Sequence, residues 1–499
     1  MSDALQTFRT LIAKIKHYEE AVSVLHWDMR TGAPRKGLAA RSEAVGALST
    51  EMFRLSVSEQ MESLLEQLGS EQALAALDDV NRRLVEDTRK QFLLSKRIPP
   101  ELYQEYVTLT AQAESEWEHA KRTADFPSFR PYLEKIVAYT RQFIDLWGYE
   151  GHPYNTLVDQ YEPGMTVAKL DEVFGELRSH TVPLVQAYGH ARKSLDRSFL
   201  RQSFDPAAQR KFSLYILKEM GFDFEAGRLD ESEHPFATGL NLGDVRITTR
   251  YKPDDVAFAL FGTIHECGHA MYEQNIAQEL AGTTLCTGAS MGIHESQSRF
   301  WEIYVASGQP FWQRYFGELQ SAFPQQLAGV TAERFCAAIN DAQPSLIRIE
   351  ADELTYNLHI MIRYELEKAL IGGDIAVADL PGLWNEKYAE YLGVTPQHDG
   401  EGVLQDVHWS GGAFGYFPSY TLGNMYAAQL MHALRNDKPG LDEMIERGEL
   451  LPVKQWLTER VHRFGKSRTP AEIITNATGE PLNPAYLIQH LQAKFRPDV

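Results

Sequence analysis

Two histidines four residues apart, with a glutamate beside the first, are the residues of this chain whose spacing most directly suggests chemistry. They form the run His265-Glu266-Cys267-Gly268-His269. Residues four apart lie on one face of a helix, so the rings of His265 and His269 can reach a single zinc ion. Glu266 can then act as general base on a zinc-bound water. The pattern indicates metal-assisted hydrolysis.

A third metal ligand is available further along the chain. Glu295 lies in the run His294-Glu295-Ser296-Gln297 and opens a second helical pattern, SQSRFWEIYVAS. Two histidines from one helix and a glutamate from a following helix form the ligand set of a catalytic zinc, with a fourth position left for water. Cobalt or manganese could replace zinc in this set. The competing interpretation is a pair of hydrogen-bonded core histidines, with Glu295 as an ordinary acid at a helix start.

Most of the chain has the hydrophobic spacing of amphipathic helices, which predicts a mainly α fold. Around the histidines, Pro253-Asp254-Asp255 is a helix start signal, and Val256, Leu260 and Ile264 recur at helical spacing. The other helices are expected at 4–25, 38–67, 71–95, 99–122, 127–147, 167–194, 311–327, 332–339 and 354–370, with a final set ending near 495.

The exception to helix lies just before the two histidines. Residues 228–251 contain glycine turn signals followed by an alternating run, which predicts a small β-ribbon. Alternation places Arg246, Thr248 and Arg250 on one face. Such a ribbon could flank a cleft and pair with an extended ligand by β-augmentation, or it could be an ordinary edge hairpin. A glycine-rich stretch at 410–420 suggests a loop that shapes a pocket.

The length of 499 residues admits two or three domains, or one large helical body divided by a cleft. No stretch rich in Gly and Ser, or in Pro, forms a linker, so we expect a single domain over 1–499. No apolar run approaches the roughly 20 residues that cross a bilayer. The charged N-terminal segment does not have the pattern of a secretory signal. We therefore expect no membrane partner.

The charge and the cysteines restrict the partners and the compartment. A net charge of −19 without a basic block argues against binding to a nucleic-acid backbone. A binding site for an anionic group of a substrate would therefore need arginines close to that site. Three cysteines are too few for a disulfide framework, and Cys267 is interpreted as a small core residue. The expected compartment is the cytoplasm.

Six short motifs, taken in order, give the chain a family resemblance. They are His234-Pro235-Phe236, Asp244-Val245-Arg246-Ile247-Thr248, His265-Glu266-Cys267-Gly268-His269, His294-Glu295-Ser296-Gln297, Ile347-Arg348-Ile349-Glu350-Ala351-Asp352 and Gly402-Val403-Leu404-Gln405-Asp406-Val407-His408-Trp409. The chain resembles the carboxypeptidase Taq family of zinc metallocarboxypeptidases nearly end to end. The resemblance implies a mainly α-helical, two-lobed body with a deep central groove, similar to neurolysin and angiotensin-converting enzyme. It also implies a homodimer and the release of single residues from peptide C-termini.

The resemblance also suggests which residues assist the zinc. Glu266 takes the proton of the attacking water and delivers it to the leaving amine. The oxyanion needs a donor besides the metal. His408 and Tyr420 are the candidates, because related groove peptidases use a histidine and a tyrosine for this purpose. Tyr420 could equally be a core or loop aromatic.

A carboxypeptidase must also recognise the terminal carboxylate, and a guanidinium matches two oxygens best. Arg348 is the favoured clamp, with Arg246 contributing or serving the structure. Arg348 could instead pair with acids of the segment 350–353 and hold a helix start. His234 is expected to shape the binding surface near the ribbon, and Asp406 to support a zinc histidine.

The leading hypothesis is a cytoplasmic zinc carboxypeptidase with broad specificity for short peptides. An endo-oligopeptidase or a peptidyl-dipeptidase could use the same zinc chemistry, and the distance of the carboxylate clamp from the metal would separate the three. A non-catalytic, zinc-stabilised helical protein is a further alternative. Glu266 argues against it, because a structural zinc site has no use for a general base.

Overall fold

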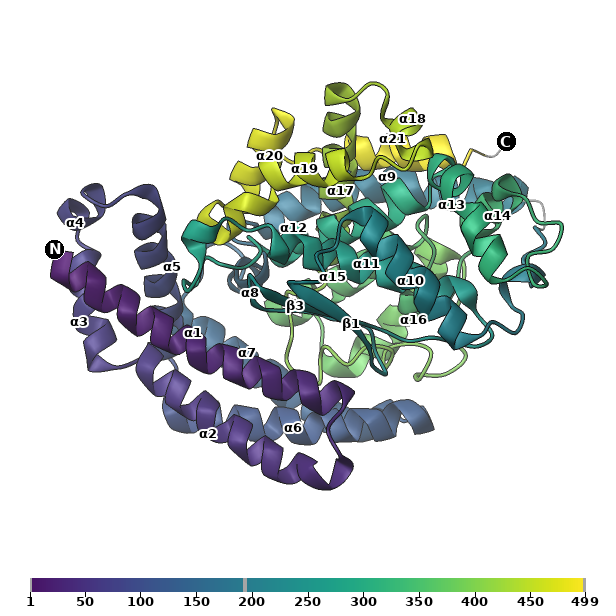
Figure 1. The fold of residues 1–499 in the computed structure, drawn as a ribbon. Helices are drawn as coiled ribbons and strands as arrows, with labels where there is room; N and C mark the ends of the chain where they lie inside the picture. Colours follow the sequence, from purple (N-terminus) through teal and green to yellow (C-terminus); the bar gives the residue numbers. More distant parts are fainter. Residues whose placement is uncertain (1, 192–194, 497–499) are drawn as a thin grey trace.

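The structure is a computed structural model that describes residues 2–191 and 195–496. Helices make up most of it, because the amphipathic spacing lets each helix bury one face (Figure 1). The helices of the N-terminal part are α1 (Ser2–Thr31), α2 (Leu38–Ser56), α3 (Glu59–Leu68), α4 (Glu71–Ala75), α5 (Asp79–Lys96), α6 (Pro100–Thr123), α7 (Phe126–Trp147), α8 (Tyr154–Tyr161) and α9 (Val167–Ala191).

The remaining helices form the rest of the body. They are α10 (Pro206–Met220), α11 (Val256–Gln274), α12 (Met291–Arg299), α13 (Gln309–Ala322), α14 (Ala332–Ile339), α15 (Tyr356–Gly372), α16 (Leu380–Leu392), α17 (Pro418–Asp437), α18 (Leu441–Glu446), α19 (Leu451–Arg460), α20 (Pro470–Thr478) and α21 (Ala485–Lys494). A π-helical segment, Phe300–Ala306, continues α12 without a break. The helix around the histidines is α11, as predicted.

Two of the predicted helices are each divided in the structure. The prediction at 38–67 becomes α2 and α3, and the prediction at 71–95 becomes α4 and α5. Ser58 and Asp78 have extended backbones and accept hydrogen bonds from backbone N–H groups of the helices that follow them. Each is an N-cap, which starts a new helix rather than continuing the old one. The end of the prediction at 167–194, residues 192–194, lies outside the described residues.

The predicted β-ribbon is a three-stranded sheet rather than a simple hairpin. β3 (Asp244–Thr249) is central, parallel to β1 (Gly227–Glu231) and antiparallel to β2 (Ala237–Asn241). On the face that alternation selects, Thr248 is fully buried, and its hydroxyl accepts hydrogen bonds from Ser232 and from the Phe236 backbone. That face is therefore partly inside the protein.

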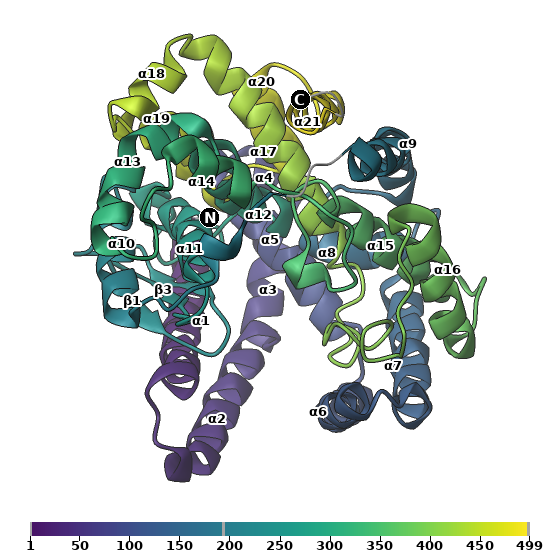
Figure 2. The ribbon, with the colours of Figure 1, turned by 90° about the vertical axis from the view of Figure 1, so that its right-hand side faces the viewer.

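The helices lie in two lobes when the molecule is turned by 90° (Figure 2). One lobe contains the sheet with α10, α11 and α13, and the other contains α7, α15 and α16. Helix α17 lies in the upper middle of the view, below α18 and α20. The predicted mainly α-helical, two-lobed architecture with a small sheet is confirmed.

Close approaches between helices bring α11, α12 and α17 together. A Cβ atom on Gly268 of α11 would lie 2.5 Å from the carbonyl oxygen of Gln297 in α12. A Cβ atom on Gly423 of α17 would lie 2.6 Å from Cγ of Glu295. Only glycine fits at these two points, so the backbones can meet with Glu295 held between them.

Candidate active site

Three acceptor atoms converge where α11 meets α12. The Nε2 atoms of His265 and His269 lie 3.7 and 3.5 Å from Oε2 of Glu295. Ligands about 2.0 Å from a tetrahedral metal lie about 3.3 Å apart, close to these separations. Within residues 2–191 and 195–496, this is the one group of three or more potential ligand residues whose atoms lie within 4.8 Å of one another. The donor set therefore fits a zinc ion.

The third candidate ligand, Glu295, lies further along its helix than the sequence suggested. Glu295 was expected to open a helix, but α12 begins at Met291 and is capped by Ser290, whose hydroxyl accepts a hydrogen bond from the Ile293 backbone. The capped turn before Glu295 fixes where its carboxylate points.

Charged side chains hold the outer edges of the cluster. Glu302, in the π-helical segment, lies with its Oε2 2.8 Å from Nδ1 of His265. Arg299 donates to Glu295 at 2.9 Å and to Glu302 at 3.1 Å. On the other side, Nδ1 of His269 lies 2.6 Å from Nδ1 of His294. These contacts use the Nδ1 atoms and leave the Nε2 atoms to face Glu295.

The pKa values of the two histidines move in opposite directions. Burial alone would lower the pKa of His265, but Glu295 and Glu302 outweigh it and raise the pKa to about 9. Burial lowers the pKa of His269 to about 4. The His269 ring is therefore neutral at pH 7, while His265 takes up a proton. A bound metal cation would supply the positive charge in place of that proton.

Glu266 is buried beside the first histidine. Glu266 is 9% exposed, and burial raises the pKa of its carboxyl to about 7. In the part of the chain that the structure describes, no side chain forms a hydrogen bond or an ion pair with this carboxylate. A carboxylate with a pKa near 7 and free oxygens can accept and release a proton near neutral pH.

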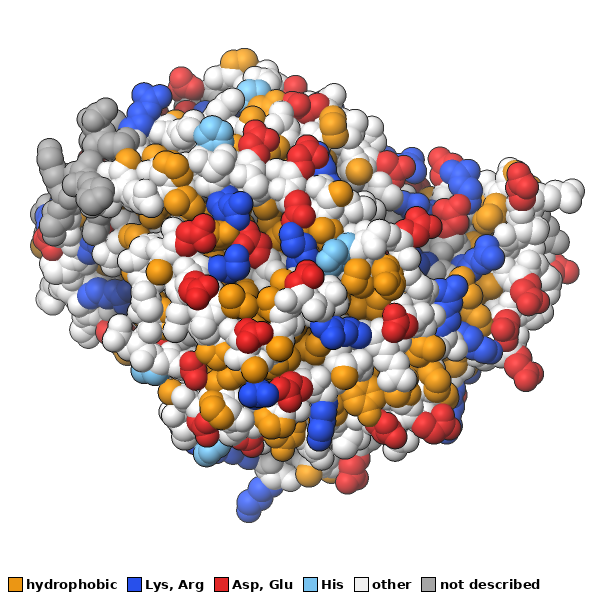
Figure 3. Space-filling model, turned by 180° about the vertical axis from the view of Figure 1, so that it is seen from behind, with side chains coloured by type: hydrophobic (Ala, Val, Ile, Leu, Met, Phe, Trp, Pro, Cys, Tyr) orange, Lys and Arg blue, Asp and Glu red, His pale blue; other side chains and the backbone are white. Residues whose placement is uncertain are grey.

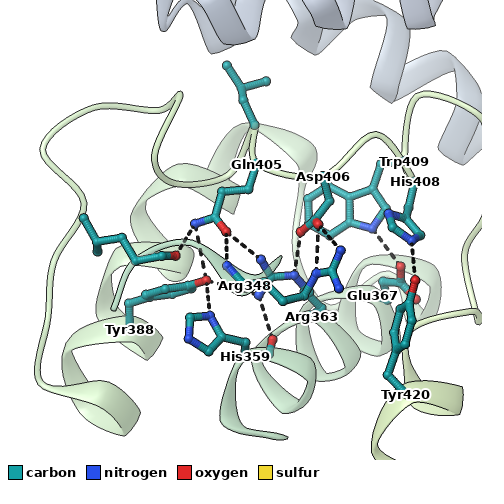
Figure 4. A network of polar contacts seen from close by, with 12 residues as sticks. Arg348, His359, Arg363, Glu367, Tyr388, Gln405, Asp406, His408, Trp409 and Tyr420 are labelled. Atoms are coloured by element: carbon teal, nitrogen blue, oxygen red, sulfur yellow. Dashed lines mark hydrogen bonds and ion pairs between the residues drawn. The ribbon is translucent and has the colours of Figure 1, made fainter. Parts of the chain in front are cut away.

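A second cluster of buried charge surrounds Asp406 (Figure 4). Its Oδ1 accepts from Nε and Nη2 of Arg348 at 2.9 and 2.8 Å, and its Oδ2 accepts from Nε of Arg363 at 2.7 Å. The side-chain oxygen of Gln405 accepts from the Arg348 backbone and from Arg363. Arg348 thus pairs with Asp406, and the expected alternative of pairing within 350–353 is wrong.

The prediction that Asp406 supports a zinc histidine is also wrong. Burial opposes ionisation of Asp406, but Arg363 and Arg348 outweigh it and hold the pKa of this carboxyl well below its usual range. The outer nitrogens of the two histidines face Glu302 and His294 instead. Both oxygens of the Asp406 carboxylate accept from arginines, and among the described residues no histidine donates to it.

His408 and Tyr420 lie together beside Arg348. Nε2 of His408 is 3.3 Å from the Tyr420 hydroxyl (Figure 4), and the Arg348 guanidinium is 5.1 Å from the centre of the Tyr420 ring. Burial lowers the pKa of His408 to about 4, so its ring is neutral. The glycine-rich stretch ends as a loop at Phe417, and Tyr420 belongs to the first turn of α17. A helix therefore positions Tyr420.

Comparison with known proteins decides the family. Residues 7–495 match the family described as Carboxypeptidase Taq (M32) metallopeptidase. The chain belongs to this family. Carboxypeptidase 1 of Bacillus subtilis is 51% identical over 488 residues, which cover 98% of this chain and 97% of that protein.

Other relatives agree with this assignment. Thermostable carboxypeptidase 1 of Thermus thermophilus is 40% identical over 479 residues, with 94% of each chain covered. The crystal structure of the M32 carboxypeptidase from Deinococcus radiodurans R1 matches with a TM-score of 0.95, at 36% identity and over 99% of each chain. This carboxypeptidase Taq family chain is accordingly a metallocarboxypeptidase, a hydrolase that uses a metal.

Two residues from the motifs of this carboxypeptidase make their contacts around the sheet. Arg246 forms two hydrogen bonds with Asp244, at 2.8 and 2.6 Å, and its guanidinium lies 5.5 Å from the ring of Trp27. His234 is exposed, and its backbone carbonyl accepts a hydrogen bond from Ser232. These contacts place both residues at the sheet rather than at the metal cluster or the arginines around Asp406.

Three residues that contact the candidate site were not predicted from the sequence. Arg299 lies four residues after Glu295 on a helix, a spacing that could have identified it. Glu302 reaches His265 only through the π-helical segment, for which the sequence contains no signal. Tyr416 has its ring 5.3 Å from that of Tyr420, and burial and then the charge of Glu295 raise its pKa to about 12.

Proposed function

We propose that this chain is a zinc carboxypeptidase that releases single residues from the C-termini of short peptides with broad specificity. The observation that carries the proposal is the convergence of the His265, His269 and Glu295 acceptor atoms beside the buried Glu266 carboxylate. An open coordination position and a free carboxylate are what a hydrolytic zinc site needs, whereas a structural zinc site is closed by a fourth protein ligand.

In the proposed site, His265, His269 and Glu295 hold the zinc ion. When bound, zinc supplies the Lewis acid that polarises the scissile carbonyl and makes water a better nucleophile. Cobalt or manganese could fill the same donor set. Arg299 and Glu302 fix the orientations of Glu295 and His265 through the hydrogen bonds described above.

Glu266 is the proposed general base. Its carboxylate takes a proton from the attacking water and then delivers it to the nitrogen of the leaving residue. The raised pKa supports this role, because a group that titrates near pH 7 can both accept and return the proton. Burial keeps competing water away from the carboxylate.

His408 and Tyr420 are the proposed donors to the oxyanion. Both are polar, partly buried and joined by a hydrogen bond. Nδ1 of His408 is buried and has no hydrogen-bond partner among the described residues. The Tyr420 hydroxyl keeps its proton because burial raises its pKa well above the usual value, so it can donate to a developing negative charge.

Arg348 is the proposed clamp for the terminal carboxylate, with His234 and Arg246 shaping the binding surface. The Arg348 guanidinium lies beside Tyr420, in the same group of polar side chains as His408 (Figure 4). Arg299 stacks on Tyr356, which accepts a hydrogen bond from Arg348, so the proposed clamp and the metal cluster are joined by two contacts. This proximity favours a carboxypeptidase over an endo-oligopeptidase, because internal cleavage needs no clamp.

The proposed setting is a cytoplasmic homodimer that acts on peptides, with the whole chain as one functional domain. Among the described residues, no helix is both long and apolar enough to span a bilayer. On the face seen in Figure 3, Lys and Arg are interspersed with Asp and Glu rather than gathered into one basic area. With a net charge of −19, this distribution supports a protein that does not bind nucleic acid.

A pair of peptides tests the proposed function. Zinc-loaded protein is incubated with one peptide that ends in a free acid and with the same peptide ending in an amide, and products are followed by mass spectrometry. We expect stepwise loss of single residues from the free acid and almost none from the amide. Loss of dipeptides would indicate a peptidyl-dipeptidase. Equal internal cleavage of both peptides would indicate an endo-oligopeptidase and remove the clamp role from Arg348.

A further inference from the structure

The two proposed metal histidines differ in what supports their outer nitrogens. Nδ1 of His265 faces a carboxylate directly, 2.8 Å from Oε2 of Glu302. Nδ1 of His269 faces a second imidazole, 2.6 Å from Nδ1 of His294. The far nitrogen of His294, Nε2, lies 2.9 Å from Oε1 of Glu273. One ligand is therefore supported by a carboxylate and the other by an imidazole followed by a carboxylate.

The end of this chain of contacts is fixed by further hydrogen bonds. Oε1 of Glu273 also accepts from the Gly288 backbone at 3.1 Å and from the Thr287 hydroxyl at 3.3 Å. Its other oxygen faces β2, where a Cβ atom on Gly239 would lie 3.1 Å away. These contacts hold the Glu273 carboxylate in an orientation in which Oε1 faces Nε2 of His294.

The ring of His294 is held by close packing. A Cβ atom on Gly288 would lie 2.6 Å from Cδ2 of His294, so only glycine fits there. On another side, the Tyr272 ring lies 5.3 Å from the His294 ring, and its hydroxyl accepts a hydrogen bond from the Ala289 backbone. The segment 287–289 therefore orients both His294 and its partner Glu273.

The direction of the hydrogen bonds in this chain follows from valence. His269 must keep the lone pair of Nε2 for the metal, so its proton is on Nδ1 and is donated to His294. His294 accepts on Nδ1, so its own proton is on Nε2 and is donated to Glu273. Two protonated Nδ1 atoms cannot face each other at 2.6 Å. The tautomer of His269 therefore determines the tautomer of His294.

We propose that His294 is a positioning residue for the metal, which acts through His269 and is itself oriented by Glu273. Glu273, at the end of the relay, makes the lone pair of His269 more basic and fixes the plane of its ring. The proposal rests on the proposed metal site at His265, His269 and Glu295. It assigns to His294 a role that is separate from ligation and from proton transfer to the substrate.

Three variants of His294 distinguish the relay from simple packing, and the readout is the zinc dissociation constant measured against a competing chelator. His294→Ala removes both hydrogen bonds, and zinc should bind roughly 10- to 100-fold more weakly. His294→Asn places an oxygen where Nδ1 was and should recover part of the affinity. His294→Gln places its amide where Nε2 was, leaves His269 without an acceptor and should resemble His294→Ala. Melting of the zinc-free proteins establishes that each variant is folded.

A double-mutant cycle tests whether Glu273 acts through His294. Glu273→Gln should weaken zinc binding in the natural background but have no further effect in the His294→Ala background. Glu302→Gln is the matched control, because Glu302 contacts His265 rather than His269. This substitution should weaken zinc binding by the same factor in both backgrounds. Non-additivity with Glu273 together with additivity with Glu302 establishes the relay.

The possible failures are separable. Equal effects of Glu273→Gln in both backgrounds, or natural zinc affinity in folded His294→Ala, would overturn the relay while leaving the metal site intact. His265→Ala serves as the reference for the site itself. If that variant binds zinc as tightly as the natural protein, the proposed metal site fails, and the relay fails with it.

Discussion

The metal cluster and the arginine cluster around Asp406 are both buried collections of charge, but they are built in opposite ways. At Asp406, two guanidinium groups donate to the two oxygens of one carboxylate. At the metal cluster, two ring nitrogens and a carboxylate oxygen face one another, and all three are atoms that can bind a metal ion. The first cluster sets two positive charges against one negative charge. The second is a set of donor atoms that fits a metal cation.

The same difference shows which cluster is suited to chemistry. Asp406 is held in place by two arginines, so its charge serves to position Arg348 and Arg363. Glu266, by contrast, is buried without a cation paired to it, and its pKa is raised to about 7. A saturated carboxylate stabilises structure, whereas an unsaturated buried carboxylate can exchange a proton.

The largest effect is expected from Glu266→Gln. The amide cannot accept a proton, so the turnover of a free-acid peptide should fall by roughly 10²- to 10⁴-fold. Zinc content, measured by elemental analysis, should stay at the natural value because Glu266 is not a ligand. Natural turnover in the zinc-loaded variant would contradict the assignment of the base.

Asp406→Asn should mainly reduce stability. Removing the charge leaves two buried guanidinium groups without a counterion, which costs roughly 3–5 kcal/mol in free energy of unfolding at pH 7. Because the folded pKa of Asp406 is depressed, its contribution is present above the unfolded pKa of about 3.9 and is lost as the pH falls below it. Denaturant unfolding at several pH values should show the difference from natural protein shrinking in acid. A difference that does not change with pH would contradict the ion pairing.

Arg348→Gln tests the clamp within the arginine cluster. Loss of a charge-assisted hydrogen bond to the substrate, about 1.5–3 kcal/mol, should raise KM for a free-acid peptide roughly 10- to 100-fold. Arg348→Lys keeps the positive charge but cannot form the bidentate contact with a carboxylate. Its KM should lie between those of the natural protein and Arg348→Gln. An unchanged preference for the free acid over the amide in Arg348→Gln would assign this arginine to structure alone.

Arg246→Gln is expected to have the smallest effect. Its pair with Asp244 is partly exposed, with side chains 18% and 33% exposed, so the free energy of unfolding should change by less than about 1 kcal/mol. Thermal melting of Arg246→Gln and of Asp406→Asn, measured side by side, compares the partly exposed Arg246–Asp244 pair with the buried pairs of Asp406. A loss as large as that of Asp406→Asn would mean that the sheet depends on this pair.

The metal cluster could be predicted from the sequence because its central features are local. The four-residue spacing of His265 and His269 on one helix determines that both rings share a face, and the motif containing Glu295 completed the set. The same spacing rule could have identified Arg299, which was not predicted. Helical periodicity likewise predicted α11 and the mainly α fold.

The arginine cluster could not be predicted in the same way because its partners are distant in sequence. Arg348, Arg363 and Asp406 come from a 3₁₀ turn, a helix and a loop, and only the fold brings them together. Asp406 was assigned to a zinc histidine because metal-binding histidines commonly donate to a carboxylate, but in the structure its partners are two arginines. Glu302 depends on a π-helical segment, whose irregular turn no periodicity analysis anticipates.

The most direct test of the central claim is the anomalous scattering of zinc in crystals of the zinc-loaded protein, measured on both sides of the zinc absorption edge. The account predicts a peak about 2.0–2.2 Å from Nε2 of His265, Nε2 of His269 and an oxygen of Glu295. A strong zinc peak elsewhere in the protein, with none between these three side chains, would contradict it.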